Sequence, residues 1–345
     1  MKAIAIQNGF GIDHLESIEV PKPQPATDEV LVKVQAVSLN YVDLMVVTGK
    51  LNPNLPLPFI PGADGAGIVE QVGNDVTAFK PGDAVVTTFI PKWTSGEPTK
   101  QAVDYATRQG VGSPGQLSEY KVFKVDRLTK APANLSALEA CTLPVAGLTA
   151  WNALHYASVT AGETVLLHGT GGVSIFALQF AKALSAHVII TSSSDAKLRR
   201  AKELGADYLI NYHTTPNWEE TVLSFTDGVG VDAVLETVGG KNLARSLGVL
   251  RTGGSISIMG LLGGSEMTID ALSLMERHAT IRGMEVGNTQ DFQDMNQAIE
   301  QHDIHPVIDR TFTFDEVRAA FTDLEQGKHF GKIAILLQRG YANKI

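Results

Sequence analysis

A short apolar strand that leads directly into a glycine-rich turn constrains this chain more than any other feature. Residues 165–168 are Val-Leu-Leu-His, the turn Gly169-Thr170-Gly171-Gly172-Val173 follows, and residues 175–184 have the pattern of an amphipathic helix. Such glycines let the backbone approach a pyrophosphate, and the helix start offers unpaired N–H groups and a positive dipole end. The turn predicts a dinucleotide site. Ser174 stands where a third Gly or Ala is usual, so either the helix packs farther from the strand or the hydroxyl meets a phosphate oxygen.

The segments after this turn alternate between strand and helix patterns. Strands rich in Val and Ile are predicted at 187–191, 208–212, 231–236 and 255–259, and helices near 195–204, from Trp218 and near 241–250. This alternation is typical of a parallel sheet covered on both faces. With right-handed crossovers it predicts a doubly wound nucleotide-binding domain.

The first 125 residues have a different pattern. Residues 29–37 and 67–72 have strand patterns, and turns such as Pro81-Gly82-Asp83 separate such segments, which predicts mainly antiparallel β-structure. Residues 91–116 are rich in Gly and Pro, and loops of that length are usually functional or mobile.

The last part of the chain does not continue the βαβ pattern of the middle. A helix near 290–301, a strand at 307–312, a helix near 315–326 and a strand at 332–337 are predicted. We therefore expect the middle to be an insertion. Residues 1–126 and 288–345 would form a substrate domain and residues 127–287 the cofactor domain, with the active site in the cleft between them.

Composition narrows the function classes. The chain has 345 residues, a formal net charge of -9 and one cysteine, Cys141. The length favours two domains, and the negative charge argues against a nucleic-acid surface or an anionic membrane as the main partner. No run approaches the ~18 apolar residues of a membrane span. With no internal disulfide possible and a strand pattern at the start instead of a signal sequence, we expect a cytoplasmic protein.

Several motifs together resemble the medium-chain dehydrogenase/reductase superfamily over nearly the whole chain. They are Asn40-Tyr41-Val42-Asp43, Pro61–Gly67, Lys80–Asp83, Gly147–Trp151, Gly169–Val173 and His329–Lys332. The resemblance implies an α/β protein with a GroES-like, mainly antiparallel β domain and a doubly wound Rossmann domain.

Zinc-dependent alcohol dehydrogenases of this superfamily carry metal ligands at positions that differ here. A cysteine is replaced by Asn40, the histidine of a Gly-His-Glu motif by Ala63, and a second cysteine or acid by Val145. Asp64 alone would be a poor zinc site. Residues 91–116, which correspond to the structural-zinc lobe, contain no cysteine. We expect no metal.

This expectation favours one type of hydride acceptor. Without a Lewis acid, reduction of an isolated carbonyl loses several kcal/mol of assistance, whereas a quinone or enone delocalises the developing charge. The chain thus resembles the zinc-free quinone oxidoreductase-like and enone reductase-like branch. Where those quinone reductases carry a tyrosine, five residues beyond the motif asparagine, this chain has Met45.

The end of the second Rossmann strand bears on the choice of cofactor. The acid that holds an NAD ribose is expected ~20 residues after the glycine turn, but Ser192-Ser193-Ser194 stands there, with Lys197 nearby. NADP(H) is therefore favoured. Alternatively, Ser193 or Ser194 caps a helix and Lys197 is a surface residue, or Asp195 approaches the ribose. The resemblance places Tyr212 beside the adenosine phosphate; otherwise it is a half-buried strand residue.

For the nicotinamide end the resemblance implies contacts from both domains. The residues are Thr149, Val238, Met259, Gly260 and Leu261, with Asn40 and Lys332 from the other domain. Thr149 could equally bond its own helix backbone, and Lys332 could snorkel from an edge strand.

Tyr41 is the first candidate for proton delivery or for binding the substrate oxygen, with Asn40 beside it, and Asp43 and Asp64 as alternatives. A packed core tyrosine is the other interpretation of Tyr41. We expect structural roles for His155, His168 and His329, and no catalytic role for Cys141.

These observations predict a zinc-independent, NADPH-dependent reductase of quinones or α,β-unsaturated carbonyls. A metal-free NADP(H)-dependent alcohol or aldehyde reductase is the enzymatic alternative, and a non-catalytic NADPH-binding sensor or binding module is the alternative of another class. The strand at 280–286 is expected at a sheet edge that pairs with a second subunit, which predicts a homodimer acting on a small-molecule substrate.

Overall fold

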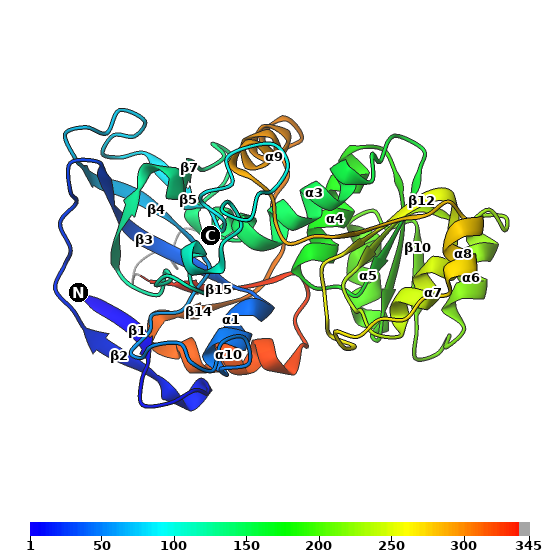
Figure 1. The fold of residues 1–345 in the computed structure, drawn as a ribbon, viewed down its shortest axis with the longest axis horizontal. Helices are drawn as coiled ribbons and strands as arrows, with labels where there is room; N and C mark the ends of the chain where they lie inside the picture. Colours follow the sequence, from blue (N-terminus) through cyan, green and yellow to red (C-terminus); the bar gives the residue numbers. More distant parts are fainter. Residues whose placement is uncertain (338–345) are drawn as a thin grey trace. The chain divides into compact units, whose positions relative to one another are not determined.

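The structure, a computed structural model, describes residues 1–337 (Figure 1). The chain forms two compact units: Met1–Leu148 with the chain from Val286 onward, and Thr149–Glu285. The first junction lies later than the boundary expected after residue 126, because β7 (Leu128–Lys130) pairs with β5 and therefore belongs to the first unit. Residues 338–345, assigned to the substrate domain from the sequence, lie outside the described residues.

The unit Thr149–Glu285 is built on a parallel sheet with the strand order β10-β9-β8-β11-β12-β13. This is the 3-2-1-4-5-6 order of doubly wound nucleotide-binding folds and confirms the Rossmann prediction. The strands are β8 (Thr164–His168), β9 (His187–Ser192), β10 (Tyr208–Asn211), β11 (Val231–Glu236), β12 (Leu250–Ile258) and β13 (Thr280–Gly283). The order reverses between β8 and β11, and β13 lies at an edge as expected.

Helices cover this sheet because its strands are apolar on both faces. The helices are α3 (Leu148–Tyr156), α4 (Gly172–Ala183), α5 (Asp195–Glu203), α6 (Trp218–Phe225), α7 (Asn242–Gly248) and α8 (Ala271–Glu276). Leu166 of β8 packs in a buried cluster with Trp218 and Leu243, whereas α4 packs against β8 and β9. Side chains alternate along a strand, so His168 shares the face of Leu166 that points toward α6 and α7.

The other unit contains a mainly antiparallel sheet with the order β14-β15-β3-β4-β5-β7, with β6 also paired to β3. The strands are β3 (Glu29–Leu39), β4 (Asp64–Val72), β5 (Ala84–Thr87), β6 (Tyr120–Lys124), β7, β14 (Ile308–Thr313) and β15 (Lys332–Leu336); β1 (Lys2–Ile6) and β2 (Leu15–Glu19) form a separate hairpin. β15 pairs antiparallel with β3, so strands from the two ends of the chain share one sheet.

Short helices and one long loop complete this unit. The helices are α1 (Tyr41–Val47), α2 (Ala137–Ala140), α9 (Thr289–Gln301) and α10 (Val317–Gln326). Residues 91–116 form no strand, but Trp93 and Val111 are buried and the Gln109 side chain donates a 2.8 Å hydrogen bond to the Thr88 carbonyl. The excursion is therefore anchored to the unit's core. Within the described residues, no helix has the length and apolar character needed to span a membrane.

Candidate cofactor and catalytic sites

The glycine turn follows the C-terminal end of β8, at the point where the strand order reverses. Gly169 has a φ of +75°, which favours glycine, and α4 begins at Gly172 after Gly171 as N-cap. A Cβ atom added at Gly169 or Gly171 would meet no atom within 4 Å, so this side of the turn is open. The first N–H groups of α4 have no acceptor within the helix. The turn therefore fits the pyrophosphate of a dinucleotide.

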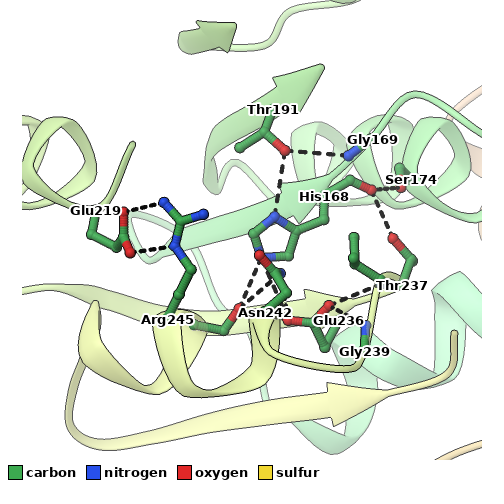
Figure 2. A network of polar contacts seen from close by, with 12 residues as sticks. His168, Gly169, Ser174, Thr191, Glu219, Glu236, Thr237, Gly239, Asn242 and Arg245 are labelled. Carbon is green, nitrogen blue, oxygen red and sulfur yellow. Dashed lines mark hydrogen bonds and ion pairs between the residues drawn. The ribbon is translucent and has the colours of Figure 1, made fainter. Parts of the chain in front are cut away.

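Three hydroxyl groups hold the peptide bond between His168 and Gly169 (Figure 2). The His168 carbonyl accepts hydrogen bonds from Ser174 Oγ at 2.7 Å and Thr237 Oγ1 at 2.8 Å, and Gly169 N–H donates to Thr191 Oγ1 at 3.3 Å. Ser174 is buried, and its hydroxyl bonds the protein's own backbone instead of pointing to a phosphate site. Ser174, which stands where a third Gly or Ala is usual, thus stabilises the start of the glycine turn.

Glu236, which sequence reasoning did not single out, is fully buried at the end of β11 and organises the next loop. Its Oε1 accepts from the backbone N–H groups of Val238 at 2.9 Å and Gly239 at 3.0 Å. Its Oε2 accepts from Asn242 Nδ2 at 2.9 Å and Ser246 Oγ at 2.6 Å. A charged residue that ends an apolar parallel strand was the available signal, because ligands bind at the carboxyl ends of such strands.

Three of the residues expected at the nicotinamide end surround Glu236. Besides Val238, the N–H groups of Met259 and Gly260 donate to the Glu236 carbonyl at 3.1 and 3.3 Å. A Cβ at Gly260 would lie 1.9 Å from a backbone oxygen, so only glycine fits. Leu261 follows and is exposed. Thr149 donates from Oγ1 to the Glu285 carbonyl at 2.6 Å, a bond outside its own helix α3.

The serines after β9 have three different environments. Ser192 is buried and its Oγ accepts from Ser194 N–H at 3.3 Å. Ser194 caps α5 by accepting from Lys197 N–H at 3.4 Å, as one of the interpretations anticipated. Ser193 is exposed. Of the three, Ser193 is the one whose side chain is open to solvent.

Two further residues flank this position. The Asp195 carboxylate accepts a 2.7 Å hydrogen bond from Asn211 Nδ2. Tyr212 is exposed, and its ring makes an edge-to-face contact with His213. Tyr212 lies directly after β10 with 39% exposure, and its place beside the adenosine phosphate stays a prediction. The hydrogen bond from Asn211 holds the Asp195 carboxylate at the end of β10, so the geometry does not support a role for Asp195 in binding the ribose.

In the other unit, Asn40 and Asp43 form the N-terminal cap of α1. The Asp43 Oδ2 accepts from Asn40 N–H at 2.8 Å, and its Oδ1 accepts from Ala63 N–H at 2.7 Å. Asp43 is fully buried, and both of its carboxylate oxygens accept from backbone N–H groups, so neither oxygen is presented to a substrate. This geometry corrects the expectation of a catalytic Asp43: its role is to join the start of α1 to the start of β4.

Lys332 and Asp64 meet at Asn40. Lys332 Nζ donates to the Leu39 carbonyl at 2.8 Å and to Asn40 Oδ1 at 2.5 Å, while Asn40 Nδ2 donates to Asp64 Oδ2 at 2.8 Å. Lys332 is 3% exposed and lies on β15, which has neighbours on both sides. It is therefore not an edge-strand lysine that snorkels to solvent.

Burial dominates the electrostatics of this cluster. It raises the pKa of Asp64 to about 7 and that of Asp43 to about 6, against the opposing effects of the Lys332 ammonium and the hydrogen bonds. It also lowers the pKa of Lys332, although both carboxylates act in the opposite direction. Asp64 Oδ1 is buried and has no hydrogen-bond partner among the described residues. The cluster can therefore hold or release a proton near neutral pH.

Tyr41 is the first residue of α1 and is 47% exposed, which excludes the packed-core interpretation. Met45 lies one turn later and is half-buried. Cys141 is fully buried and donates from Sγ to the Leu138 carbonyl, and burial raises the pKa of its thiol well above the usual value. Its environment is that of a structural cysteine.

The donor set around Asn40 does not fit a zinc ion. Asn40, Ala63 and Val145 supply no thiolate or imidazole, and Asp64 Oδ2 already accepts from Asn40 and Ser38 with the Lys332 ammonium 3.9 Å away. A dication beside a buried ammonium is electrostatically unfavourable. Nowhere in residues 1–337 do three or more His, Cys, Asp or Glu side chains gather in a way that could hold a metal.

Comparisons with known proteins agree with this architecture. Residues 26–133 match the alcohol dehydrogenase GroES-like domain, and residues 172–301 match the zinc-binding dehydrogenase domain. A zinc-type alcohol dehydrogenase-like protein of Schizosaccharomyces pombe is 44% identical, with 94% of this chain and 96% of that protein covered. A crystal structure of a putative alcohol dehydrogenase from Sinorhizobium meliloti superimposes with a TM-score of 0.92 at 39% identity, covering 97% of this chain and 98% of that one.

Relatives named for other reactions are also similar. A quinone oxidoreductase of Lama guanicoe is 30% identical, with 98% of each chain covered. A 2-methylene-furan-3-one reductase of Solanum lycopersicum is 32% identical, with 97% of this chain and 79% of that protein covered. These matches extend over both units. The chain is therefore an oxidoreductase of the medium-chain dehydrogenase/reductase family, whose members use a nicotinamide cofactor.

Proposed function

We propose that this protein is a zinc-independent, NADPH-dependent reductase of quinones or α,β-unsaturated carbonyl compounds. The observation that carries the proposal is the buried ammonium of Lys332 beside Asp64 and against Asn40, and Asn40 stands where zinc-dependent relatives carry a cysteine ligand. A site of amides and an ammonium can donate hydrogen bonds but cannot act as a strong Lewis acid. This chemistry favours acceptors that delocalise the charge created by hydride addition.

Bound NADPH supplies the hydride in this proposal. The N–H groups at the start of α4 hold the pyrophosphate. Tyr41, which is exposed, donates a hydrogen bond to the acceptor oxygen. An enone gains a hydride at its β-carbon and a proton at its α-carbon, so its C=C bond becomes a single bond. Water or the Tyr41 hydroxyl provides that proton.

The preference for NADPH rests on the residues after β9. Ser193 is exposed, no carboxylate occupies its position, and the Asp195 carboxylate is already bonded to Asn211. A 2′-phosphate placed there would meet no repelling acid at Ser193 and could attract the Lys197 ammonium. A carboxylate in this position is what selects NADH in related folds.

The test is a turnover assay of the purified protein with a benzoquinone, a simple enone and a simple aldehyde, each with NADPH or NADH. We expect oxidation of NADPH with the quinone or the enone, and the same rate after dialysis against a chelator. Turnover confined to the aldehyde would favour the alcohol or aldehyde reductase alternative. Nucleotide binding without any turnover would favour the sensor alternative.

We also propose a homodimer. β13 is an edge strand of its sheet, and α8, directly before it, exposes Leu272 and Met275. An unpaired strand edge beside apolar surface is a site for association. Light scattering should give the mass of two chains, and a monomeric mass would exclude this arrangement.

A further inference from the structure

His168 connects the glycine turn to the loop after β11. Its Nε2 lies 2.9 Å from Ser246 Oγ. Its Nδ1 lies 3.4 Å from Thr191 Oγ1 (Figure 2). Ser246 contacts Glu236, and Thr191 contacts the Gly169 N–H. These residues come from β8, β9, β11 and α7, and share one face of the sheet.

The proton positions along this chain of contacts follow from the donors at its far end. Four donors converge on the Glu236 carboxylate, two on each oxygen, so the Ser246 hydroxyl proton points to Glu236. Ser246 Oγ can then only accept from His168, which places the imidazole proton on Nε2. His168 Nδ1 accepts from the Thr191 hydroxyl, and Thr191 Oγ1 accepts from Gly169 N–H. Each hydrogen bond between Glu236 and the Gly169 N–H therefore has one defined donor and one defined acceptor.

The surroundings keep the imidazole neutral. His168 is 3% exposed, and its ring makes an edge-to-face contact with Trp218. The Arg245 guanidinium lies over the Trp218 ring. Burial, with a smaller contribution from Arg245, lowers the pKa of His168 and outweighs the opposing effect of Glu236. The 3.7 Å contact between His168 Nε2 and Glu236 Oε2 is therefore not an ion pair at neutral pH.

We infer that His168, Thr191, Ser246 and Glu236 are positioning residues that hold the Gly169 turn and the Val238–Gly239 backbone in one fixed spacing for the cofactor. This inference rests on the proposed nucleotide site, because it assigns both backbone segments to the same bound NADPH. The Thr191 hydroxyl is the link between the imidazole and the Gly169 N–H, and its loss leaves the Glu236 contacts in place.

The test compares Thr191→Val with a matched control, Thr226→Val. In both substitutions, valine keeps the shape of threonine and removes a hydroxyl that accepts a hydrogen bond from a glycine N–H. Thr226 Oγ1 accepts from Gly230 N–H at 3.1 Å. Gly230 precedes β11 and lies at the opposite end of the strands from the cofactor turn. Affinity for NADPH alone, without an acceptor, is measured by nucleotide fluorescence, and folding by urea denaturation.

We expect Thr191→Val to bind NADPH about tenfold more weakly, as for one lost hydrogen bond, and Thr191→Ser to restore binding to within about twofold of wild type. Thr226→Val should bind within about twofold of wild type even if it unfolds more easily. Equal affinity of Thr191→Val and wild type, or equal losses in both valine variants, would overturn the inference. Turnover by the wild type plays no part in this comparison, so it separates the inference from the proposed reaction.

A second measurement is made on the wild-type protein. In wild-type protein with ¹⁵N-labelled histidine at pH 7, the His168 signal should show a proton on Nε2 and none on Nδ1, assigned by its absence in His168→Gln. A proton on Nδ1 would reverse the direction of the chain and overturn the assignment. If the wild type binds neither NADPH nor NADH, the inference and the proposed function both fail.

Discussion

The ammonium nitrogen of Lys332 lies 3.9 Å from Oδ2 of Asp64, and both side chains are removed from solvent. A buried charge whose partner is removed is strongly destabilising, whereas loss of both partners costs much less. The pair is therefore best tested by substituting both residues separately and together.

Lys332→Met should lower the free energy of unfolding by about 3–5 kcal/mol at pH 8, because it leaves the Asp64 carboxylate and the Leu39 carbonyl without their cationic partner. The same substitution in an Asp64→Asn background should cost at least about 1 kcal/mol less, since no carboxylate is then stranded. Urea denaturation of the wild type, the two single variants and the double variant measures this coupling. An equal cost of Lys332→Met in both backgrounds would contradict it.

The stability should also depend on pH through the buried carboxyls. Burial raises the pKa of Asp64 to about 7 and that of Asp43 to about 6, above the value near 4 of an unfolded chain. The folded state thus binds protons more tightly, and this stabilisation is complete below pH 4 and is lost as the pH rises through about 6 and 7.

Asp64→Asn removes the larger part of this dependence. Between pH 5 and 8 the variant should gain about 2–3 kcal/mol of stability relative to wild type, as measured by urea denaturation at each pH. Asp83→Asn is the control, because Asp83 lies in a turn of the same unit between two exposed residues, and its side chain is 14% exposed whereas that of Asp64 is fully buried. Parallel profiles for wild type and Asp64→Asn would show that Asp64 is ionised throughout this range.

The sequence predicted the parts of this protein that depend on local pattern. The turn at Gly169, the helix after it and the alternation of strands and helices are encoded in contiguous residues, and the structure places them as expected. The seven-residue helix α1 was not anticipated, because a helix that short has too little periodicity to recognise.

What depends on strand order could not be predicted. From the sequence alone, Lys332 could equally lie on an edge strand, because only the strand order shows that β14 lies beside β15. Glu236 and Thr191 acquire their roles only because β8 lies between β9 and β11, which brings them to His168 from distant positions in the chain. Ser174 left two interpretations open, and its bond to the His168 carbonyl is a tertiary fact of the same kind.

Ser193→Asp should change the preferred nucleotide. Ser193 is exposed beside the cap of α5, and a carboxylate there would repel a 2′-phosphate while accepting a hydrogen bond from a ribose hydroxyl. We expect NADPH affinity to fall about tenfold or more while NADH affinity is unchanged or higher. Fluorescence titration with both nucleotides measures this. Ser224→Asp, at an exposed position on α6, is the control for added charge. Equal nucleotide preferences in both variants would refute the assignment.

Tyr41→Phe should separate substrate chemistry from cofactor binding. The Tyr41 ring is 47% exposed at the start of α1, so losing its hydroxyl should leave the unfolding free energy within about 0.5 kcal/mol of wild type. If this hydroxyl binds the acceptor oxygen or delivers the proton, kcat with the quinone or enone should fall about 100-fold, with NADPH affinity unchanged. Tyr208→Phe removes another partly exposed phenol, from β10, and should retain full activity. A Tyr41→Phe protein with wild-type kcat would instead assign the proton to water.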